Sequence, residues 1–408
     1  MSQQLVKPVR ESAPSGDARR GLPASLAARL GSSVLSRGTA MPAIASLLGI
    51  ALFFQWQSPY FLSPENLSNL TVQATLIAVI ALGEVVVLLL GEIDLSLGSV
   101  AGATAAILGV LMTSGNLPWY VAVPLMLASG AAMGAFQGWW IAWLGIPSFV
   151  VTLAGLMAFL GLQLFILGPQ GTLSVFDPTI AGLTNALLPV GIGWVLGIGL
   201  VGAVLAVALI RGTTGRREVR LLVPVLLSAL GLGVVAVFNS ARGVPMPFLI
   251  LIGMLLIAWW ITRHTRPGRH LFAVGGNAEA ARRAGVSVTK VRFAAFTVSG
   301  TIAAIGGVFA VSYNGSAGTL TGGGTLLLEA IGAAVIGGTS LFGGRGTVWA
   351  ALFGALIMGG VSNGLNLMNA GQPVKYMVQG TIVLFAVSLD TILRRRQSRG
   401  RLVGGLRA

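Results

Sequence analysis

Two short polar segments interrupt an otherwise apolar chain, and the first carries a cluster of acidic and hydroxyl side chains. It reads GEIDLSLGS and contains Glu92, Asp94 and Ser96, while Glu84 lies inside the apolar run just before it. A carboxylate inside a bilayer costs about 2.5–3.5 kcal/mol on insertion scales, so this cluster needs a compensating role. Two compatible roles are open: Asp94 or Ser96 caps a helix that begins near Leu97, or the interruption lines the path of a solute.

The second polar segment, residues 263–292, has the features of a loop that contains one short helix. The helix is marked by Asn277 as N-cap, Glu279 in the first turn, Arg282 and Arg283 in the last turn, and Gly285 after its end. A helix of so few residues is unstable alone in water, because too few hydrogen bonds offset its nucleation. We therefore predict that it docks on a cytosolic partner; the alternative is a solvated basic loop.

Residue types needed for most enzymatic chemistry are missing. The chain has no cysteine and two histidines, His264 and His270, each beside an arginine. This leaves no thiolate or imidazole cluster for a metal, a cofactor or a nucleophile. None of the lysines (Lys7, Lys290 and Lys375) follows a glycine, so the GK[ST] core of a phosphate-binding loop is absent. We expect no enzyme activity, no metal and no cofactor in this chain.

Composition indicates the elements that must position these segments. Of 408 residues, 55% are hydrophobic and 9% are charged, whereas soluble domains carry about 25% charged residues. Apolar runs recur at 41–56, 70–90, 97–113, 119–142, 148–167, 187–210, 221–238, 247–262, 293–313, 326–343, 347–362 and 376–393. We predict an all-α polytopic membrane protein with about 10–12 transmembrane helices. The interruptions near 91–98 and 318–325 are typical of broken or re-entrant helices.

The distribution of positive charge predicts the orientation. The formal net charge is +15, and most basic residues lie before Met41, at 211–220, at 263–292 and after Ile392, each cluster beside an apolar run. Such clusters mark the cytoplasmic face of a membrane protein, and alternating spans place all four on one side. Both termini and residues 263–292 are therefore expected in the cytosol. Nucleic acid is the weaker explanation of the charge, and we expect no nucleic-acid partner.

This orientation divides the chain into three regions. We predict a cytosolic, mostly disordered tail at 1–40, a transmembrane domain at 41–393 and a basic cytosolic tail at 394–408. The first region is too long and uneven for the n-region of a signal peptide.

Polar side chains near span ends or breaks are candidates for the wall of a solute path. Besides Glu92, Asp94 and Ser96, the candidates are Asn314, Glu329, Asn363 and Asn366, and Gln73 and Gln163 have a similar placement. Each of these side chains also fits a packing role, in which it forms a hydrogen bond between helices.

Three segments together resemble one known family. They read GEIDLSLGS (91–99), GRHLFAVGGNAEAARRAGVSVTKVRFAAFTVSGTIAAIGGV (268–308) and LLLEAIGAAVIGGTSLFGGRGTVWAALFGALIMGGVSNGLNLM (326–368). In this order and spacing they look like the permease subunit of bacterial ABC-type monosaccharide importers, and the resemblance runs from about Asn66 to Leu393. An extra span with the connection RGTTGRREVR (211–220) is most similar to the xylose branch of the ribose, xylose and arabinose permeases.

The resemblance implies a permease homodimer in the lipid of the inner membrane, two separate ATPase subunits, and a periplasmic sugar-binding protein that delivers the monosaccharide. It also implies that a coupling helix for the ATPase lies within GGNAEAARRAG (275–285), with the contact residues Gly276, Asn277, Glu279, Arg282, Arg283 and Gly285. The main alternative is an ion-coupled secondary transporter in which Glu84, Glu92, Asp94 or Glu329 binds the ion. A docking helix favours the importer, because it has no purpose without a partner.

Overall fold

The computed structural model describes residues 40–211, 217–323, 325–385 and 387–388, so nearly all of the predicted tails at 1–40 and 394–408 lies outside the described residues. The first half contains α2 (Ala40–Gln57), α3 (Pro64–Leu89), α4 (Leu97–Thr113), α5 (Trp119–Trp143), α6 (Ser148–Leu167), α7 (Pro178–Asn185) and α8 (Val190–Arg211). The second half contains α9 (Arg217–Ala241), α10 (Met246–His264), α11 (Arg266–Gly276), α12 (Ala278–Arg283), α13 (Val288–Asn314), α14 (Thr325–Ile336) and α15 (Trp349–Leu367). Residues 372–385 form a further helix.

The predicted apolar runs lie largely in helices, which confirms the all-α polytopic class. Within the described residues, six helices are long and apolar enough to cross a membrane: α3, α5, α6, α10, α13 and α15. Shorter apolar helices occur within α2, α4, α8, α9 and α14. The number of crossings, about 10–12, stays a prediction.

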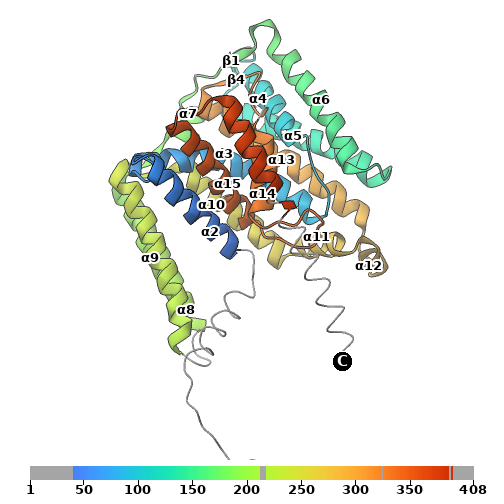
Figure 1. Ribbon diagram of the computed structural model, residues 1–408. Helices are drawn as coiled ribbons and strands as arrows, with labels where there is room; N and C mark the ends of the chain where they lie inside the picture. Colours follow the sequence, from blue (N-terminus) through green and yellow to red (C-terminus); the bar gives the residue numbers. More distant parts are fainter. Residues whose placement is uncertain (1–39, 212–216, 324, 386, 389–408) are drawn as a thin grey trace, which may run out of the picture.

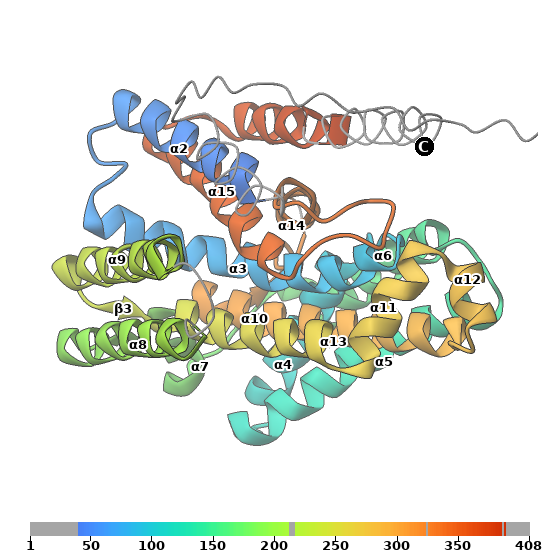
Figure 2. The ribbon, with the colours of Figure 1, turned by 90° about the horizontal axis from the view of Figure 1, so that it is seen from below.

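Helix α3 forms the centre of the molecule (Figure 1). Its start is specified locally, because the hydroxyl of Ser63 accepts a hydrogen bond from the amide of Asn66 and Pro64 occupies the first turn. Helix α3 contacts α13 and α10 on one side and α15 and α14 on the other, and Figure 2 shows it between these layers. Its 26 residues extend for about 39 Å, enough to cross a hydrocarbon core of about 30 Å.

Small residues bring α5 and α13 into close contact. A methyl group at Gly134 would overlap the carbonyl oxygen of Phe296, and one at Gly300 would overlap that of Gly130. Close approach of backbones is how membrane helices associate, since no hydrophobic effect acts between them in lipid. These glycines therefore allow α5 and α13 to pack closely.

Helices α4 and α14 are short and buried. At 17 and 12 residues they extend for about 25 and 18 Å, less than the hydrocarbon core. Helix α14 ends at Ile336, before the end of the apolar run 326–343. Two residues later, Gly338 takes a positive φ of 103°. The start of α4 meets the other break, because Gly98 packs directly on the carbonyl oxygen of Gly322. These lengths agree with the prediction of broken helices.

Short strands, which the sequence did not predict, lie near the loops at one end of the bundle. Strand β1 (Thr172–Ser174) pairs antiparallel with β4 (Ser316–Gly318), and β2 (Leu187–Leu188) pairs antiparallel with β3 (Val244–Pro245). A three-residue 3-10 helix, η1 (Gly168–Gln170), precedes β1. The pairs connect distant loops and leave the all-α class unchanged.

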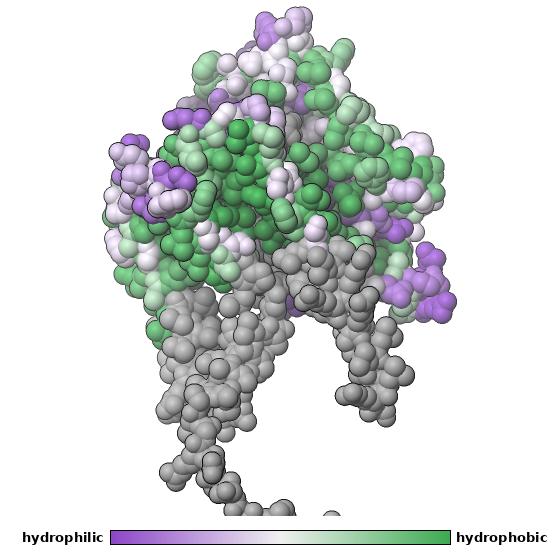
Figure 3. Space-filling model, in the orientation of Figure 1, coloured by the Kyte–Doolittle hydropathy of each residue, from purple (hydrophilic) through white to green (hydrophobic). Residues whose placement is uncertain are grey.

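The visible face of the molecule carries a broad hydrophobic area between hydrophilic patches. Figure 3 shows hydrophilic residues at the top and at the lower right, with hydrophobic residues between them. Large apolar side chains such as Phe165, Ile257 and Trp260 are exposed. An exposed apolar surface of this extent is suited to contact with lipid.

Candidate functional site

A polar cavity of about 530 Å³ lies beside the first turns of α3. The polar residues that line it are Glu65, Asn66, Ser68, Asn69 and Gln73 of α3, Thr184 and Asn185 of α7, Arg242, Tyr313 of α13 and Asn363 of α15. A volume in this range is typical of sites for small ligands.

Two amides at the cavity hold α3 and α15 together. Nδ2 of Asn66 donates to Oδ1 of Asn363 at 2.8 Å, and Nδ2 of Asn363 donates to Oδ1 of Asn66 at 3.0 Å. Asn66 also donates to the carbonyl oxygen of Phe61. Asn363, predicted as a path residue, therefore lines the cavity and also makes the interhelical hydrogen bond that was its alternative role.

Other side chains of the cavity are free to bind a ligand. Within the described part of the chain, the side-chain amides of Asn69 and Gln73 have no hydrogen-bond partner. Among the same residues, Glu65 and Arg242 have no ion-pair partner. Tyr313 adds an exposed aromatic ring. Amides, charged groups and an aromatic ring can together bind several hydroxyl groups and one apolar face of a small solute.

Most of the residues that line this cavity were not predicted from the sequence. A detectable signal is the polar stripe on α3, in which Glu65, Asn69 and Gln73 recur every four residues and so lie on one helix face. The lining residues Arg242 and Tyr313 carry no comparable local signal, because only the packing of α9 and α13 brings them to α3.

Asp94 and Ser96 belong to a buried network instead of the cavity. Oδ1 of Asp94 accepts hydrogen bonds from the amide of Ser96 at 2.9 Å and from its hydroxyl at 2.6 Å, and the hydroxyl is also bonded to the side chain of Gln137 on α5. Ser96 occupies the N-cap position of α4, but its side chain makes no capping hydrogen bond. The prediction that Ser96 caps α4 is therefore wrong. The carboxylate of Asp94 instead accepts a hydrogen bond from the amide of Ser96, the residue before the helix.

Glu92 lies at the opposite end of α3 from the cavity. Its carboxylate pairs with the guanidinium of Arg292 at 2.8 Å, and the side chains are 14% and 32% exposed respectively. Arg292 is the last residue of segment 263–292 and lies in the first turns of α13, which begins at Val288. Glu92 thus connects the break after α3 to the basic segment.

The remaining predicted path residues also lie away from the cavity. Glu329 of α14 accepts a hydrogen bond of 2.6 Å from Gln379 of the helix at 372–385. Asn314 ends α13 and Asn366 lies in the last turn of α15, and both are exposed. Among the described residues, the structure brings Asn363 of the predicted path set into the cavity, together with Gln73, which the sequence analysis placed beside that set.

The short helix predicted in 263–292 is present as α12. Oδ1 of Asn277 accepts the amide of Ala280 at 2.9 Å, and Glu279 pairs with Arg283 at 3.2 Å and with Arg282 at 3.5 Å. Gly285 follows the helix with a φ of 83°, and Gly276 is the last residue of α11, a helix that the sequence did not predict. The charged side chains of α12 are more than half exposed, so they are available to a partner.

Backbone contacts join α11 to the breaks in the membrane helices. The amide of Gly344 donates to the carbonyl oxygen of Leu89 at 2.9 Å. A methyl group at Gly275 would overlap the same oxygen, and one at Gly91 would crowd the carbonyl of Phe342. We call this contact of residues 89–91, 275–276 and 342–344 the glycine junction.

Buried apolar helices, a polar cavity at one end and an exposed charged helix at the other define a multi-pass membrane transport protein. A family model described as the branched-chain amino acid transport system permease component matches residues 66–387, and the chain belongs to this family.

Curated relatives cover most of the chain. It is 36% identical to the xylose transport system permease protein XylH of Escherichia coli, over 86% of this chain and 92% of that protein. It is 32% identical to XylH of Haemophilus influenzae, over 86% and 96% respectively. It is 31% identical to the ribose import permease protein RbsC of E. coli, over 85% and 92%. No solved structure matches.

Proposed function

We propose that the chain is the permease subunit of an ATP-driven importer for a xylose-like monosaccharide, with ATP hydrolysed by a separate subunit. The observation that carries this proposal is the placement of two features at opposite ends of α3 in a chain of this family. The polar cavity lies beside the N-terminal turns of α3, and the glycine junction and α12 lie beside its C-terminal end.

The cavity suits a neutral sugar. Asn69 and Gln73 offer both donors and acceptors, which is what hydroxyl groups require, and Tyr313 offers a ring face. A transport path must also release what it admits, so hydrogen-bonding side chains that each bind weakly make a suitable wall. The cavity is therefore proposed as the periplasmic part of the path, where a sugar-binding protein delivers the substrate.

The opposite end suits coupling to an ATPase. Helix α12 is exposed and charged, and it follows α11, which touches the break after α3 through the glycine junction. In the glycine junction backbone atoms touch directly, and no flexible side chain lies between them to absorb a movement. A displacement of α11 therefore displaces residues 89–91 and 342–344 as well. We propose α12, with Gly276, Asn277, Glu279, Arg282, Arg283 and Gly285, as the ATPase contact.

The orientation follows from charge. Basic residues of 263–292 lie at the α12 end, so this end is proposed as cytosolic and the cavity end as periplasmic. A second copy of the permease in the inner membrane completes the assembly that we propose.

The ion-coupled alternative is less well supported, because three of its four carboxylates have structural partners. Glu92 is paired with Arg292, and Asp94 and Glu329 accept hydrogen bonds from Ser96 and Gln379 respectively. Glu84 is the carboxylate to test, since it is fully buried and neither of its oxygens has a hydrogen-bond partner in the described residues.

Proteoliposomes that contain the whole complex test the proposal. We expect xylose accumulation that requires ATP on the cytosolic side, resists an uncoupler, and survives Glu84→Gln, because an amide fills the same space without a charge. Gln73→Ala should lower uptake severalfold, whereas Asn314→Ala, outside the cavity, should not. Accumulation that needs no ATP and is abolished by an uncoupler or by Glu84→Gln would establish the ion-coupled carrier instead.

A further inference from the structure

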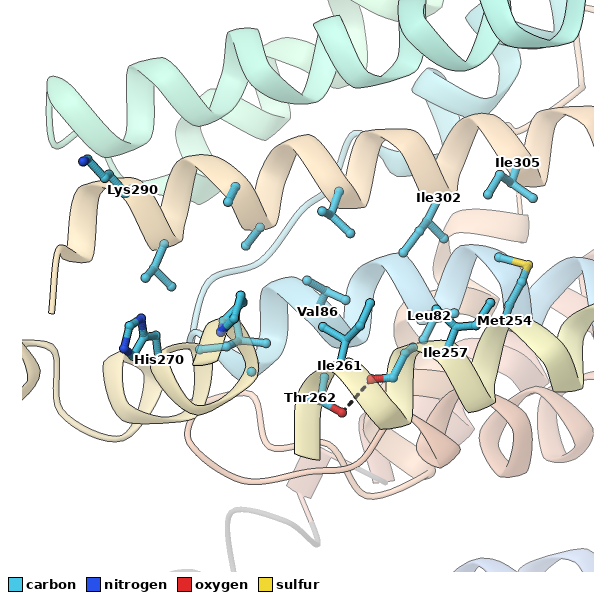
Figure 4. Close-up of a pocket in the computed structure, with 18 residues that line it drawn as sticks. Leu82, Val86, Met254, Ile257, Ile261, Thr262, His270, Lys290, Ile302 and Ile305 are labelled. Carbon is cyan, nitrogen blue, oxygen red and sulfur yellow. Dashed lines mark hydrogen bonds between the residues drawn. The ribbon is translucent and has the colours of Figure 1, made fainter. Parts of the chain in front are cut away.

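An apolar groove of about 550 Å³ opens between α10 and α13. Figure 4 shows Leu82 and Val86 of α3 at its base. Its walls carry Met254, Ile257 and Ile261 from α10 and Val298, Ile302 and Ile305 from α13. Ile257 and Val298 are 62% and 47% exposed, so the groove is open to the membrane.

Two basic side chains lie at one end of the groove. Figure 4 shows His270 and Lys290 at the end opposite Ile305, and Thr262 between the two ends. The hydroxyl of Thr262 is satisfied by the carbonyl oxygen of Ala258 at 2.7 Å. His270 and Lys290 are exposed, and within the described residues neither has an acidic partner. The groove therefore ends in an uncompensated positive charge.

The length of the groove matches one leaflet of a bilayer. From Lys290 to Ile305, α13 rises about 22 Å. Half of a bilayer, with its headgroup region, is about 20–22 Å thick. The ammonium group of Lys290 thus lies at headgroup depth when the apolar end at Ile305 lies near the midplane.

We propose that this groove is a binding site for an anionic phospholipid of the cytoplasmic leaflet. One acyl chain lies between α10 and α13, and the phosphate of the headgroup contacts Lys290 and His270. Basic pockets between membrane helices on the cytoplasmic side bind such headgroups. The other basic residues of 263–292 assign this end to the cytoplasmic leaflet.

Charge favours a lipid over a second copy of the chain as the occupant. Among the acidic side chains that the structure describes, Glu92 and Glu279 lie at this end, and both are already in ion pairs. Asp94, near Glu92, is buried. Within the described residues, a second copy therefore offers no free counter-charge to Lys290, whereas a phosphate does.

Fluorescence quenching tests the site in the full-length chain, which has no native cysteine. Ala294→Cys, on the exposed lining of the groove, is labelled with bimane in phosphatidylcholine vesicles. We expect dibrominated phosphatidylglycerol to reach half-maximal quenching at a mole fraction about fivefold below that of dibrominated phosphatidylcholine, the factor contributed by about one basic residue near the surface. A label placed by Leu153→Cys, on exposed α6, should respond equally to the two lipids.

A variant without the charge of Lys290 tests whether the groove causes the preference for phosphatidylglycerol. Lys290→Gln should abolish it, whereas Arg283→Gln, at the same end but outside the groove, should preserve it. Phosphatidylglycerol should also raise the Tm of the unlabelled protein more than phosphatidylcholine does, and Lys290→Gln should remove that difference. Equal quenching by the two lipids, no quenching by either, or a preference that survives Lys290→Gln overturns the proposal.

Discussion

The ion pair between Glu92 and Arg292 joins the first break to the basic segment, and the effect of its loss can be predicted quantitatively. The two side chains are 14% and 32% exposed and 2.8 Å apart. Hydrogen bonds to charged groups contribute about 1.5–3 kcal/mol when partly buried, and exposed pairs about 0.2–1 kcal/mol. We expect a coupling energy of about 1.5 kcal/mol.

A double-mutant cycle measures this coupling energy directly. The unfolding free energies of Glu92→Gln, Arg292→Gln and the double variant are determined by SDS titration in mixed micelles. Each single variant leaves one charge unpaired, so each should lose more stability than an isolated neutral substitution would, and the second substitution should then have little further effect.

The chain offers a matched control in Glu279 and Arg283. This pair is 3.2 Å apart, but its side chains are 57% and 80% exposed, so its coupling energy should stay near about 0.3–0.5 kcal/mol. Uptake in the whole complex should fall with Glu92→Gln, because the break is then less firmly held to α13. A coupling energy for Glu92 and Arg292 no larger than that of the exposed pair would refute the reasoning.

Three further predictions follow from packing, topology and docking. Gly134→Ala should destabilise the protein by about 1–3 kcal/mol in the same titration, because the added methyl group overlaps the carbonyl oxygen of Phe296, whereas Gly161→Ala, with open space around it, should be neutral. Ala280→Cys should react with an impermeant reagent in inverted vesicles and not in intact spheroplasts; labelling from outside the cell would reverse the orientation. Glu279→Arg should abolish co-purification of the ATPase at normal expression, since it places a third positive charge on α12 and disfavours its helix dipole; unchanged uptake would remove α12 from the contact.

Local features were predictable in detail. The ends of α12 depend on a hydrogen bond between residues three apart, from Ala280 to Asn277, and on the conformation of Gly285. Such interactions need no knowledge of the rest of the chain. The apolar runs predicted the helices for a similar reason, because about 20 consecutive apolar residues can satisfy their backbone in a membrane only as a helix.

The functional site was less predictable, because its members come from distant parts of the chain. Asn363 was predicted as a path residue with an interhelical hydrogen bond as its alternative role, but its partner Asn66 is 297 residues away. Glu92 was placed with Asp94 by sequence proximity, yet the turn after α3 points it to Arg292, while Asp94 is held by Ser96. Two carboxylates only two positions apart thus have partners in different parts of the chain.

The sequence by itself determined the class of protein, most of the apolar helices and the short capped helix, because composition, periodicity and capping act over a few residues. Only the tertiary structure decided that Asn69, Gln73 and Tyr313 share a cavity and that Gly275 touches Leu89. These relations depend on which helices pack together and at what depth. The free energy that selects one helix packing is a sum over many contacts of similar chemistry. No single residue in the sequence therefore predicts that packing.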